Sequence, residues 1–298
     1  MSDSPVTFER FRSDTRRPVP PLPPKSCDCH VHVVGVPERY PYRRSWPFIP
    51  PIELPREATP AALGEMHRVA GIERALIVQP GHYGTDHRLL LETLATSQNY
   101  RGTAVLDDNV TESEMQKLHE GGVRSARFVF WKRMNQAPSP ATFRRAIARM
   151  AEFGWHVKIH AVGEEWTELA ELLNEVRIPA VIDHFANVDL AAGMDQPGVS
   201  FMERAIQKPN WWVLLANGDR RSSQDEGWVD VVPLARRLIE AAPDRMLWAT
   251  DWPHLGYTKR MPNDGELVEL LYRFAPKLEL RRKILVDNPA RLIGFSDD

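Results

Sequence analysis

The stretch Cys27-Asp28-Cys29-His30-Val31-His32 lies close to the N-terminus and contains a His-x-His pair. In a β-strand, residues two apart point to the same face. The alternation therefore predicts one face with Asp28, His30 and His32, and an opposite face with the two cysteines and Val31. Two imidazole groups at the end of a strand provide half of the ligands of a divalent metal site. We expect the remaining ligands to come from other strands.

The chain has two cysteines, Cys27 and Cys29. A buried cysteine usually packs as a small apolar residue. A bridge between residues two apart on one strand face would be strained, because their Cα atoms lie near the ~7 Å limit. We therefore expect no structural disulfide, and a Cys-x-Cys metal or redox pair is the alternative.

The composition suits an ordinary folded protein, with 298 residues, 43% apolar content and a formal net charge of −2. The length fits one large domain or two small ones. The small net charge gives no general basic field for nucleic acid or acidic membranes. No apolar run reaches the ~20 residues that span a bilayer, and the polar, proline-rich N-terminus lacks the apolar core of a signal peptide. These features predict a cytoplasmic protein without a nucleic-acid or membrane partner.

Residues 1–25 are charged and rich in proline, which predicts a flexible or extended arm before a single domain over 26–298. Within that domain, short apolar segments typical of strands alternate with segments of helical periodicity. The eight expected strands are 26–34, 74–80, 101–106, 123–130, 155–161, 178–184, 211–216 and 246–251.

Three of the intervening segments have the apolar spacing of a helix that covers a core. In one of them, Ser139 is placed as N-cap and Pro140 as the first helical residue. The three apolar stripes are Phe143, Ala146, Ile147, Met150 and Phe153; Trp166, Leu169, Leu173 and Val176; and Leu90, Leu91 and Leu94.

Eight strands that alternate with helices predict a closed parallel (β/α)8 barrel, the TIM barrel, with an open doubly wound sheet as the alternative. The strand count favours closure, and so do polar residues at the predicted C-terminal ends, because a barrel brings these ends together at one mouth. Neither a Gly-x-Gly-x-x-Gly nor a Walker pattern supports a nucleotide-binding open sheet. The polar residues at the strand ends are His30, His32, Arg127, His160, His184 and Asp251.

A long connection over residues 35–58 follows the first predicted strand and combines six prolines with Tyr40, Tyr42, Trp46 and Phe48. Loops of this length without regular structure are usually functional or disordered, and the aromatic residues argue against disorder. We expect a lid over the barrel mouth, with a packed surface loop as the alternative.

The His-x-His on strand one and Asp251 at the end of strand eight resemble the pattern of the amidohydrolase superfamily, as does the closing segment 284–292. More narrowly, four segments resemble the lactonases of aromatic-compound breakdown that hydrolyse 2-pyrone-4,6-dicarboxylate and 4-sulfomuconolactone. The resemblance spans nearly the whole barrel. The four segments are 27–35, 84–86, 127–133 and 181–184.

The resemblance implies a metal site. Zinc-dependent superfamily members carry a histidine ligand on strand five, where this chain has His160. The pyrone dicarboxylate enzymes, understood to work without a metal, carry a tyrosine there. We therefore expect one zinc ion per chain, held by His30, His32, His160 and Asp251. Asp251 is also the expected general base, and His184 would polarise the substrate, orient the water or serve as an extra ligand. The alternative makes His160 a metal-free substrate contact.

Arginines near the ends of strands four and seven predict a small anionic substrate, because guanidinium groups bind carboxylate or sulfonate oxygens in pairs. Gly81 and Gly84 allow the loop after strand two to approach a ligand closely. The predicted substrate-binding residues are Arg127, Arg133, Arg220 and Arg221, with one of the last two facing the site, and His82 and Tyr83.

These features together predict a zinc-dependent lactonase. Where the pyrone enzymes place an arginine three residues after the strand-six histidine, this chain has Asn187. That departure and His160 favour 4-sulfomuconolactone, opened to maleylacetate and sulfite, over the pyrone. The alternatives are a metal-independent 2-pyrone-4,6-dicarboxylate hydrolase, a zinc-dependent decarboxylase of an aromatic or muconate-like acid, and a non-catalytic binding barrel. The absence of a Gly-x-Ser-x-Gly elbow gives a serine hydrolase no support.

Overall fold

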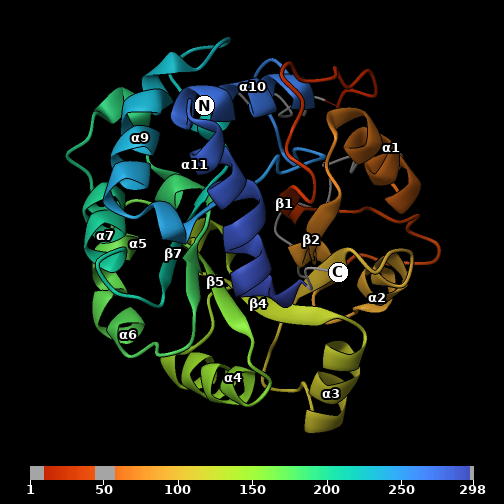
Figure 1. Cartoon of the computed structure of the whole chain (residues 1–298). Coiled ribbons are helices and arrows are strands. Elements are labelled where there is room, and N and C mark those ends of the chain that lie inside the picture. The colour runs from red at the N-terminus through yellow and green to blue at the C-terminus, as the bar shows by residue number, and fades with distance from the viewer. Residues whose placement is uncertain (1–9, 44–57, 296–298) are drawn as a thin grey trace, which may run out of the picture.

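The computed structural model describes residues 10–43 and 58–295. Its centre is a single sheet of eight parallel strands that follow one another in chain order (Figure 1). The strands are β1 (Cys27–Val31), β2 (Arg74–Val78), β3 (Tyr100–Ala104), β4 (Val123–Val129), β5 (His156–His160), β6 (Ala180–Ile182), β7 (Trp211–Leu215) and β8 (Met246–Trp248).

The sheet curves round so that the segment after β8 meets β1. The amide of Asp251 donates to the carbonyl of His30 at 3.1 Å, and the amide of His32 donates to the carbonyl of Trp252 at 2.8 Å. The prediction of a (β/α)8 barrel is therefore confirmed. All eight predicted strands are present, and each ends before its predicted C-terminal limit, so the residues that follow belong to the loops of the mouth.

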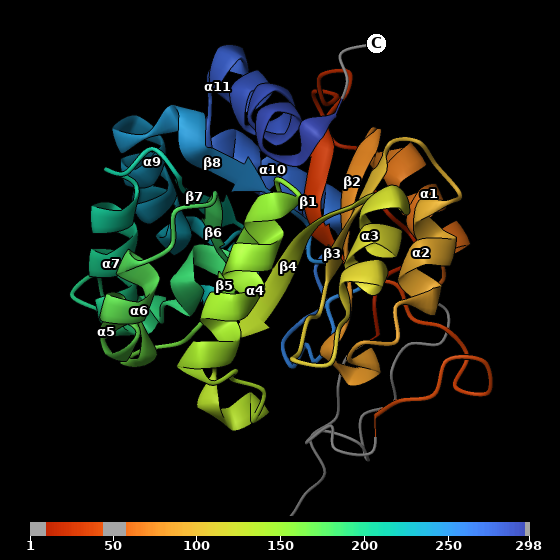
Figure 2. The same cartoon turned by 90° about the horizontal axis from the view of Figure 1, so that it is seen from below.

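Helices cover the outside of the barrel (Figures 1 and 2). α4 shows why they form where they do, since the Ser139 side chain accepts a hydrogen bond from the amide of Thr142 and Pro140 occupies the first turn. The prediction for this helix start is confirmed. The helices are α1 (Pro60–Ala70), α2 (Arg88–Leu94), α3 (Glu112–Glu120), α4 (Pro140–Glu152), α5 (Glu165–Glu168), α6 (Ala170–Asn174), α7 (Pro197–Ala205), α8 (Gly218–Arg221), α9 (Val232–Ala241), α10 (Asp264–Phe274) and α11 (Leu278–Arg282), with short turns η1 (Gly81–Tyr83), η2 (Lys132–Met134) and η3 (His184–Asn187) at strand ends.

The core has two parts. One fills the space between strands and helices, and the other fills the lower barrel interior with residues such as Cys29, Leu76 and Trp212. The C-terminal segment beyond α11 lies across the N-terminal end of the barrel, where Ile293 and Phe295 join the interior cluster (Figures 1 and 2). With this end closed, only the opposite end, where the strands finish, can serve as the mouth.

The predicted alternation in β1 is wrong at Asp28 and at Val31, which packs in the outer cluster while Cys27 and Cys29 lie in the interior one. The pairing of β1 with β2 shifts register between Asp28 and Val31. As a result, Asp28 does not join His30 and His32 but lies with its Oδ2 atom 3.6 Å from Nε2 of His67 on α1. A register shift places an extra residue in one strand, so strict alternation breaks at that point.

Residues 10–22 run along α10. The amide of Arg16 donates to Oδ1 of Asn263 at 2.7 Å, and the hydroxyl of Tyr272 donates to the carbonyl of Pro20 at 2.6 Å. A Cβ atom at Gly265 would lie 2.2 Å from the Arg16 carbonyl oxygen, so the arm and the helix touch directly at this point.

The lid predicted for residues 35–58 is described only at its two ends. Tyr40 is anchored on α2, because its hydroxyl donates to Glu92 at 2.6 Å. Trp46, Phe48 and the rest of 44–57 lie outside the described residues. Across residues 10–43 and 58–295, no helix combines the length and apolar character that a membrane crossing requires.

Candidate active site

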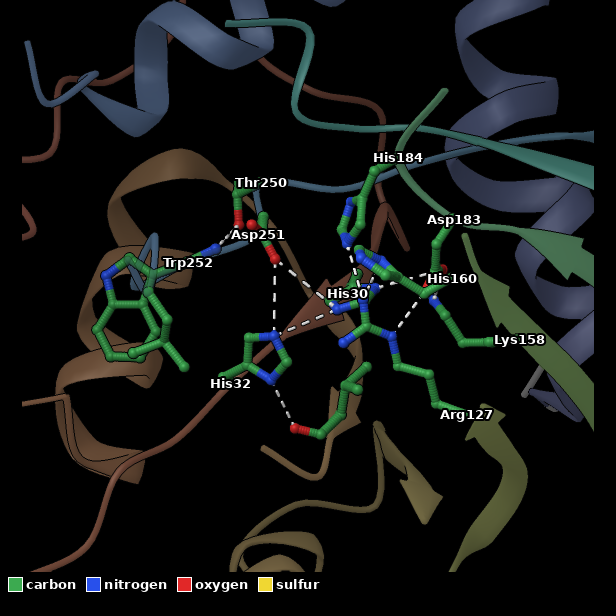
Figure 3. A network of polar contacts seen from close by, with 12 residues as sticks. His30, His32, Arg127, Lys158, His160, Asp183, His184, Thr250, Asp251 and Trp252 are labelled. Carbon is green, nitrogen blue, oxygen red and sulfur yellow. Dashed lines mark hydrogen bonds and ion pairs between the residues drawn. The ribbon is translucent and has the colours of Figure 1, made fainter. Parts of the chain in front are cut away.

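Three potential ligand atoms converge at the barrel mouth (Figure 3). The Nε2 atoms of His30 and His32 lie 3.3 Å apart, and Oδ1 of Asp251 lies 3.7 Å from the first and 3.6 Å from the second. All three residues are buried. We call these three atoms the first donor set.

Hydrogen bonding places the proton of His32, and burial keeps both rings neutral. Nδ1 of His32 is 2.8 Å from the carbonyl oxygen of Val78, which can only accept, so Nδ1 carries the proton. Burial lowers the pKa of His32 to about 4, although Asp251 opposes this, and lowers the pKa of His30 well below its usual range. His30 Nδ1 faces Oδ1 of Asp183 at 3.6 Å. Both rings are therefore neutral, His32 carries its lone pair on Nε2, and His30 Nε2 lies within hydrogen-bond distance of it.

The two Nε2 atoms are within hydrogen-bond distance, and a metal ion in place of a shared proton would accept lone pairs from both rings and from Asp251. Tetrahedral zinc with Zn–N bonds of about 2.0–2.1 Å holds its ligand atoms roughly 3.4 Å apart. The observed separations of 3.3–3.7 Å are close to this value. The residues present therefore fit a metal ion of this kind.

Asp251 is held in an unusual backbone conformation, with φ of 65°. Such left-handed geometry costs a non-glycine residue about 1–3 kcal/mol. Asp28 restrains the preceding residue, because its carboxylate accepts from the amide of Thr250 at 3.1 Å and from the hydroxyl of Thr250 at 2.5 Å. Burial alone would raise the pKa of Asp251, but the adjacent His184 and Arg220 hold it well below its usual range. Asp251 is therefore ionised.

Asp183 connects the histidines to two cations, the buried Lys158 and the half-buried Arg127 (Figure 3). Its Oδ2 accepts from Nε of Arg127 at 2.7 Å, and its Oδ1 lies 3.3 Å from Nζ of Lys158. Burial alone would raise the pKa of Asp183, but these two cations hold it well below its usual range. No role was predicted from the sequence for Asp183 or Lys158. Lys158 is two residues before His160 in the same strand, and this spacing could have indicated a shared inward face.

His160 contacts the arginine of β4. Nη2 of Arg127 donates to Nδ1 of His160 at 2.9 Å and to Nε2 of His184 at 3.3 Å. Among the described residues, the groups able to hold a metal are His30 with His32 and Asp251, and His30 with Asp183 and His184. The structure thus brings His160 to the mouth through Arg127, but into neither group.

His184 lies in η3, where four consecutive residues have φ between 51° and 53°. This left-handed turn directs the chain away from β6 as soon as the strand ends. The ring of His184 lies 4.5 Å from that of His30. Burial lowers the pKa of His184 to about 3, so the ring is neutral.

Of the two arginines after β7, Arg220 contacts Asp251, at the carboxylate oxygen outside the first donor set. Its Nη2 lies 3.5 Å from Oδ2 of Asp251 and donates to the carbonyl of Leu255 at 3.1 Å, while the guanidinium stacks on Tyr257 at 4.8 Å. Arg221 is half-buried, and burial lowers its pKa.

The other predicted substrate contacts differ in their surroundings. Arg133 is exposed and lies over the ring of Trp131 at 5.9 Å. His82 is buried, and its pKa falls to about 3 through burial and the neighbouring His32. The hydroxyl of Tyr83 accepts from the amide of Gly35 at 2.9 Å. Tyr83 thereby fixes the segment that follows β1.

Comparison with known proteins gives relatives over most of the chain. The amidohydrolase family matches residues 27–295. The 4-sulfomuconolactone hydrolase of Hydrogenophaga intermedia is 38% identical over 277 residues, which cover 92% of this chain and 90% of that protein. The 2-pyrone-4,6-dicarboxylate hydrolase of Comamonas testosteroni is 32% identical over 281 residues, covering 91% of this chain and 90% of that protein.

A solved structure shares the architecture. An apo crystal structure from Agrobacterium tumefaciens gives a TM-score of 0.82 at 26% identity and covers 94% of this chain and 99% of that one. This likeness extends over the whole barrel, and the sequence matches above extend over nearly all of it. The chain therefore belongs to the amidohydrolase family.

Proposed function

We propose that this protein is a zinc-dependent lactonase that opens a small anionic lactone, with 4-sulfomuconolactone as the preferred substrate. The observation that carries the proposal is the first donor set, in which two imidazole nitrogens and a carboxylate oxygen converge at separations of 3.3–3.7 Å. Relatives named 4-sulfomuconolactone hydrolase, at 38% and 37% identity, support this choice of substrate.

His30, His32 and Asp251 would hold the zinc ion. His160, the further ligand proposed from the sequence, would have to use Nε2, because Arg127 donates to its Nδ1. When bound at such a site, zinc polarises a carbonyl oxygen and lowers the pKa of water towards ~7.

Asp251 is the proposed general base. Its carboxylate is ionised and would take a proton from the attacking water, then return it to the ring oxygen as the lactone opens. Arg220 lies 3.5 Å from the second oxygen of this carboxylate, which limits its rotation. His184 would polarise the substrate or orient the water from the same side as Arg127, to which it is bound.

The arginines would hold the anionic groups of the substrate. Arg127 comes from β4 and Arg220 from α8, and their side chains are only 14% and 15% exposed, so an anion bound to either would be largely desolvated. Desolvation strengthens a charge-assisted hydrogen bond. Arg133, Arg221, His82 and Tyr83 complete the proposed substrate-binding set. For 4-sulfomuconolactone, ring opening would release sulfite and leave maleylacetate.

A metal-independent 2-pyrone-4,6-dicarboxylate hydrolase is the second candidate. It is favoured by the place of His160, which lies with Arg127 and outside both groups of possible metal ligands. In that case the histidines would contact the substrate directly. The composition favours the cytoplasm as the place of action for either candidate.

The test is metal content and lactone hydrolysis on the same sample, purified without chelators. We expect one zinc ion per chain by inductively coupled plasma mass spectrometry, and hydrolysis of 4-sulfomuconolactone that dipicolinate removes and zinc restores. Undiminished hydrolysis of the pyrone by metal-free protein would instead establish the second candidate.

A further inference from the structure

His30 takes part in two groups of possible metal ligands. Its Nε2 belongs to the first donor set, with His32 and Asp251. On its other side, Nδ1 faces Asp183, and the structure places ligand atoms of His30, Asp183 and His184 within 4.8 Å of one another. We call these last three residues the second donor set. A metal ion therefore has two overlapping places to bind around a single imidazole.

Only the second donor set is already neutralised by fixed cations. Nζ of Lys158 lies 3.3 Å from Oδ1 of Asp183, and Nε of Arg127 lies 2.7 Å from Oδ2. Nη2 of the same arginine donates to His184 at 3.3 Å. In the first donor set, the nearby cation is Arg220, which faces Oδ2 of Asp251 and leaves Oδ1 to the two histidines.

Lys158 is built into the barrel wall. It lies on β5 with no exposed surface, and its ammonium donates to the carbonyl of Cys29 on β1 at 3.1 Å. A buried ammonium group is costly unless it is paired, and the carboxylate of Asp183 supplies that pairing. The positive charge of Lys158 is therefore buried inside the barrel, where it contributes neither to solubility nor to recognition at the surface.

We propose that Lys158 is a positioning residue that fills the second donor set with a fixed positive charge and so confines a metal ion to His30, His32 and Asp251. A divalent ion among His30, Asp183 and His184 would be repelled by the adjacent ammonium. The inference rests on the metal-dependent function proposed above. It explains why a metal would bind next to Asp251 and Arg220, where the base and one substrate anion site lie.

The test compares metal binding in two variants that lack the first donor set. His32→Ala/Asp251→Asn removes two of its three ligands, and the same protein with Lys158→Met removes the ammonium as well. Methionine keeps the length of the lysine stem without its charge. After equilibration with buffered zinc, we expect almost no zinc in the double variant and one zinc ion per chain in the triple variant, measured by mass spectrometry.

Two controls separate charge from folding. Lys158→Gln also removes the charge but retains a donor for the Cys29 carbonyl, so it replaces methionine if the latter prevents folding. Ser125→Ala removes a buried hydrogen bond to Thr103, observed at 2.6 Å. Added to the double variant, it should lower the melting temperature without restoring zinc. Circular dichroism establishes that each protein is folded.

The outcomes distinguish this inference from the proposed function. A folded triple variant that takes up no more zinc than the double variant would overturn the role of Lys158. If the unmodified protein binds no zinc at all, the metal-dependent function fails, but the comparison of the double and triple variants still decides whether Lys158 blocks the second donor set.

Discussion

The side chains of Arg127 and Asp183 form an ion pair at the centre of the barrel mouth, with Nε of the arginine 2.7 Å from Oδ2 of the carboxylate. The same carboxylate faces His30, and the same guanidinium contacts His160. This ion pair therefore joins the proposed metal ligands to the proposed anion-binding group, so a change at either partner should affect both.

Asp183→Asn tests this link. We expect zinc affinity to fall about 10–100-fold, as for other residues that orient metal ligands, and KM for the lactone to rise because Arg127 loses its partner. Competition with a chelator and steady-state kinetics provide the two measurements. Asp108→Asn, at a carboxylate that pairs with Arg145 on the surface, is the control and should change neither. A loss of stability alone, with unchanged zinc affinity, would contradict the link.

Asp251→Asn tests the general base. The amide keeps the size of the side chain but cannot take a proton, so kcat should fall by roughly 10²–10⁴-fold. The measurement is turnover of both lactones by zinc-saturated protein, so that weaker metal binding does not mimic the effect. Near-full turnover on either lactone would show that another group is the base.

Arg220→Lys tests the stacked guanidinium. Lysine retains the charge but loses the planar contact with Tyr257 and the ability to bind Leu255 and Asp251 together. We expect kcat/KM to fall about 100-fold, which corresponds to roughly 2.7 kcal/mol of transition-state stabilisation. Arg133→Lys at the exposed position should have a much smaller effect. A loss in Arg220→Lys as small as that in Arg133→Lys would mean that Arg220 acts only through its charge.

The buried ring of His156 should make the folded protein less stable in acid. Its ring is buried in β5, has no hydrogen-bond partner among the residues that the structure describes, and has a pKa lowered to about 3 by burial and by Lys158. Between the usual value of about 6.5 and about 3, the unfolded chain binds a proton that the folded chain does not. Folding stability should therefore fall as pH falls below about 6.5, by up to ~1.4 kcal/mol per pH unit from this residue.

Urea unfolding from pH 7 to pH 4.5 measures this dependence. His156→Leu should flatten it by about one proton, whereas His119→Leu, at a partly exposed histidine, should flatten it less. An unchanged slope in His156→Leu would show that other groups account for the acid sensitivity.

The fold could be predicted from the sequence because its signals are local. Strand alternation and helix periodicity repeat within a few residues, and the Ser139-Pro140 helix start depends on side chains within one turn. The alternation failed at Asp28 because the register shift in β1 arises from pairing with a distant strand. No pattern inside residues 27–32 contains that information.

The site was predictable only in part. The strand-end positions placed His30, His32 and Asp251 at one mouth, and the structure brings these three together. The sequence could not show that Arg127 is bound to Asp183, since strands four and six meet only through tertiary packing. For the same reason, His160 was expected among the ligands, whereas its Nδ1 atom is hydrogen-bonded to Arg127.

The contact between Gly265 and the Arg16 carbonyl also has a consequence for related sequences. Any side chain at position 265 would have to push the N-terminal segment away from α10. A related sequence with a larger residue there must route its N-terminus along another path, even if its barrel is the same. The residue at position 265 therefore predicts, from sequence alone and without reference to the catalytic residues, whether the N-terminal segment of a relative can lie along α10 as it does here.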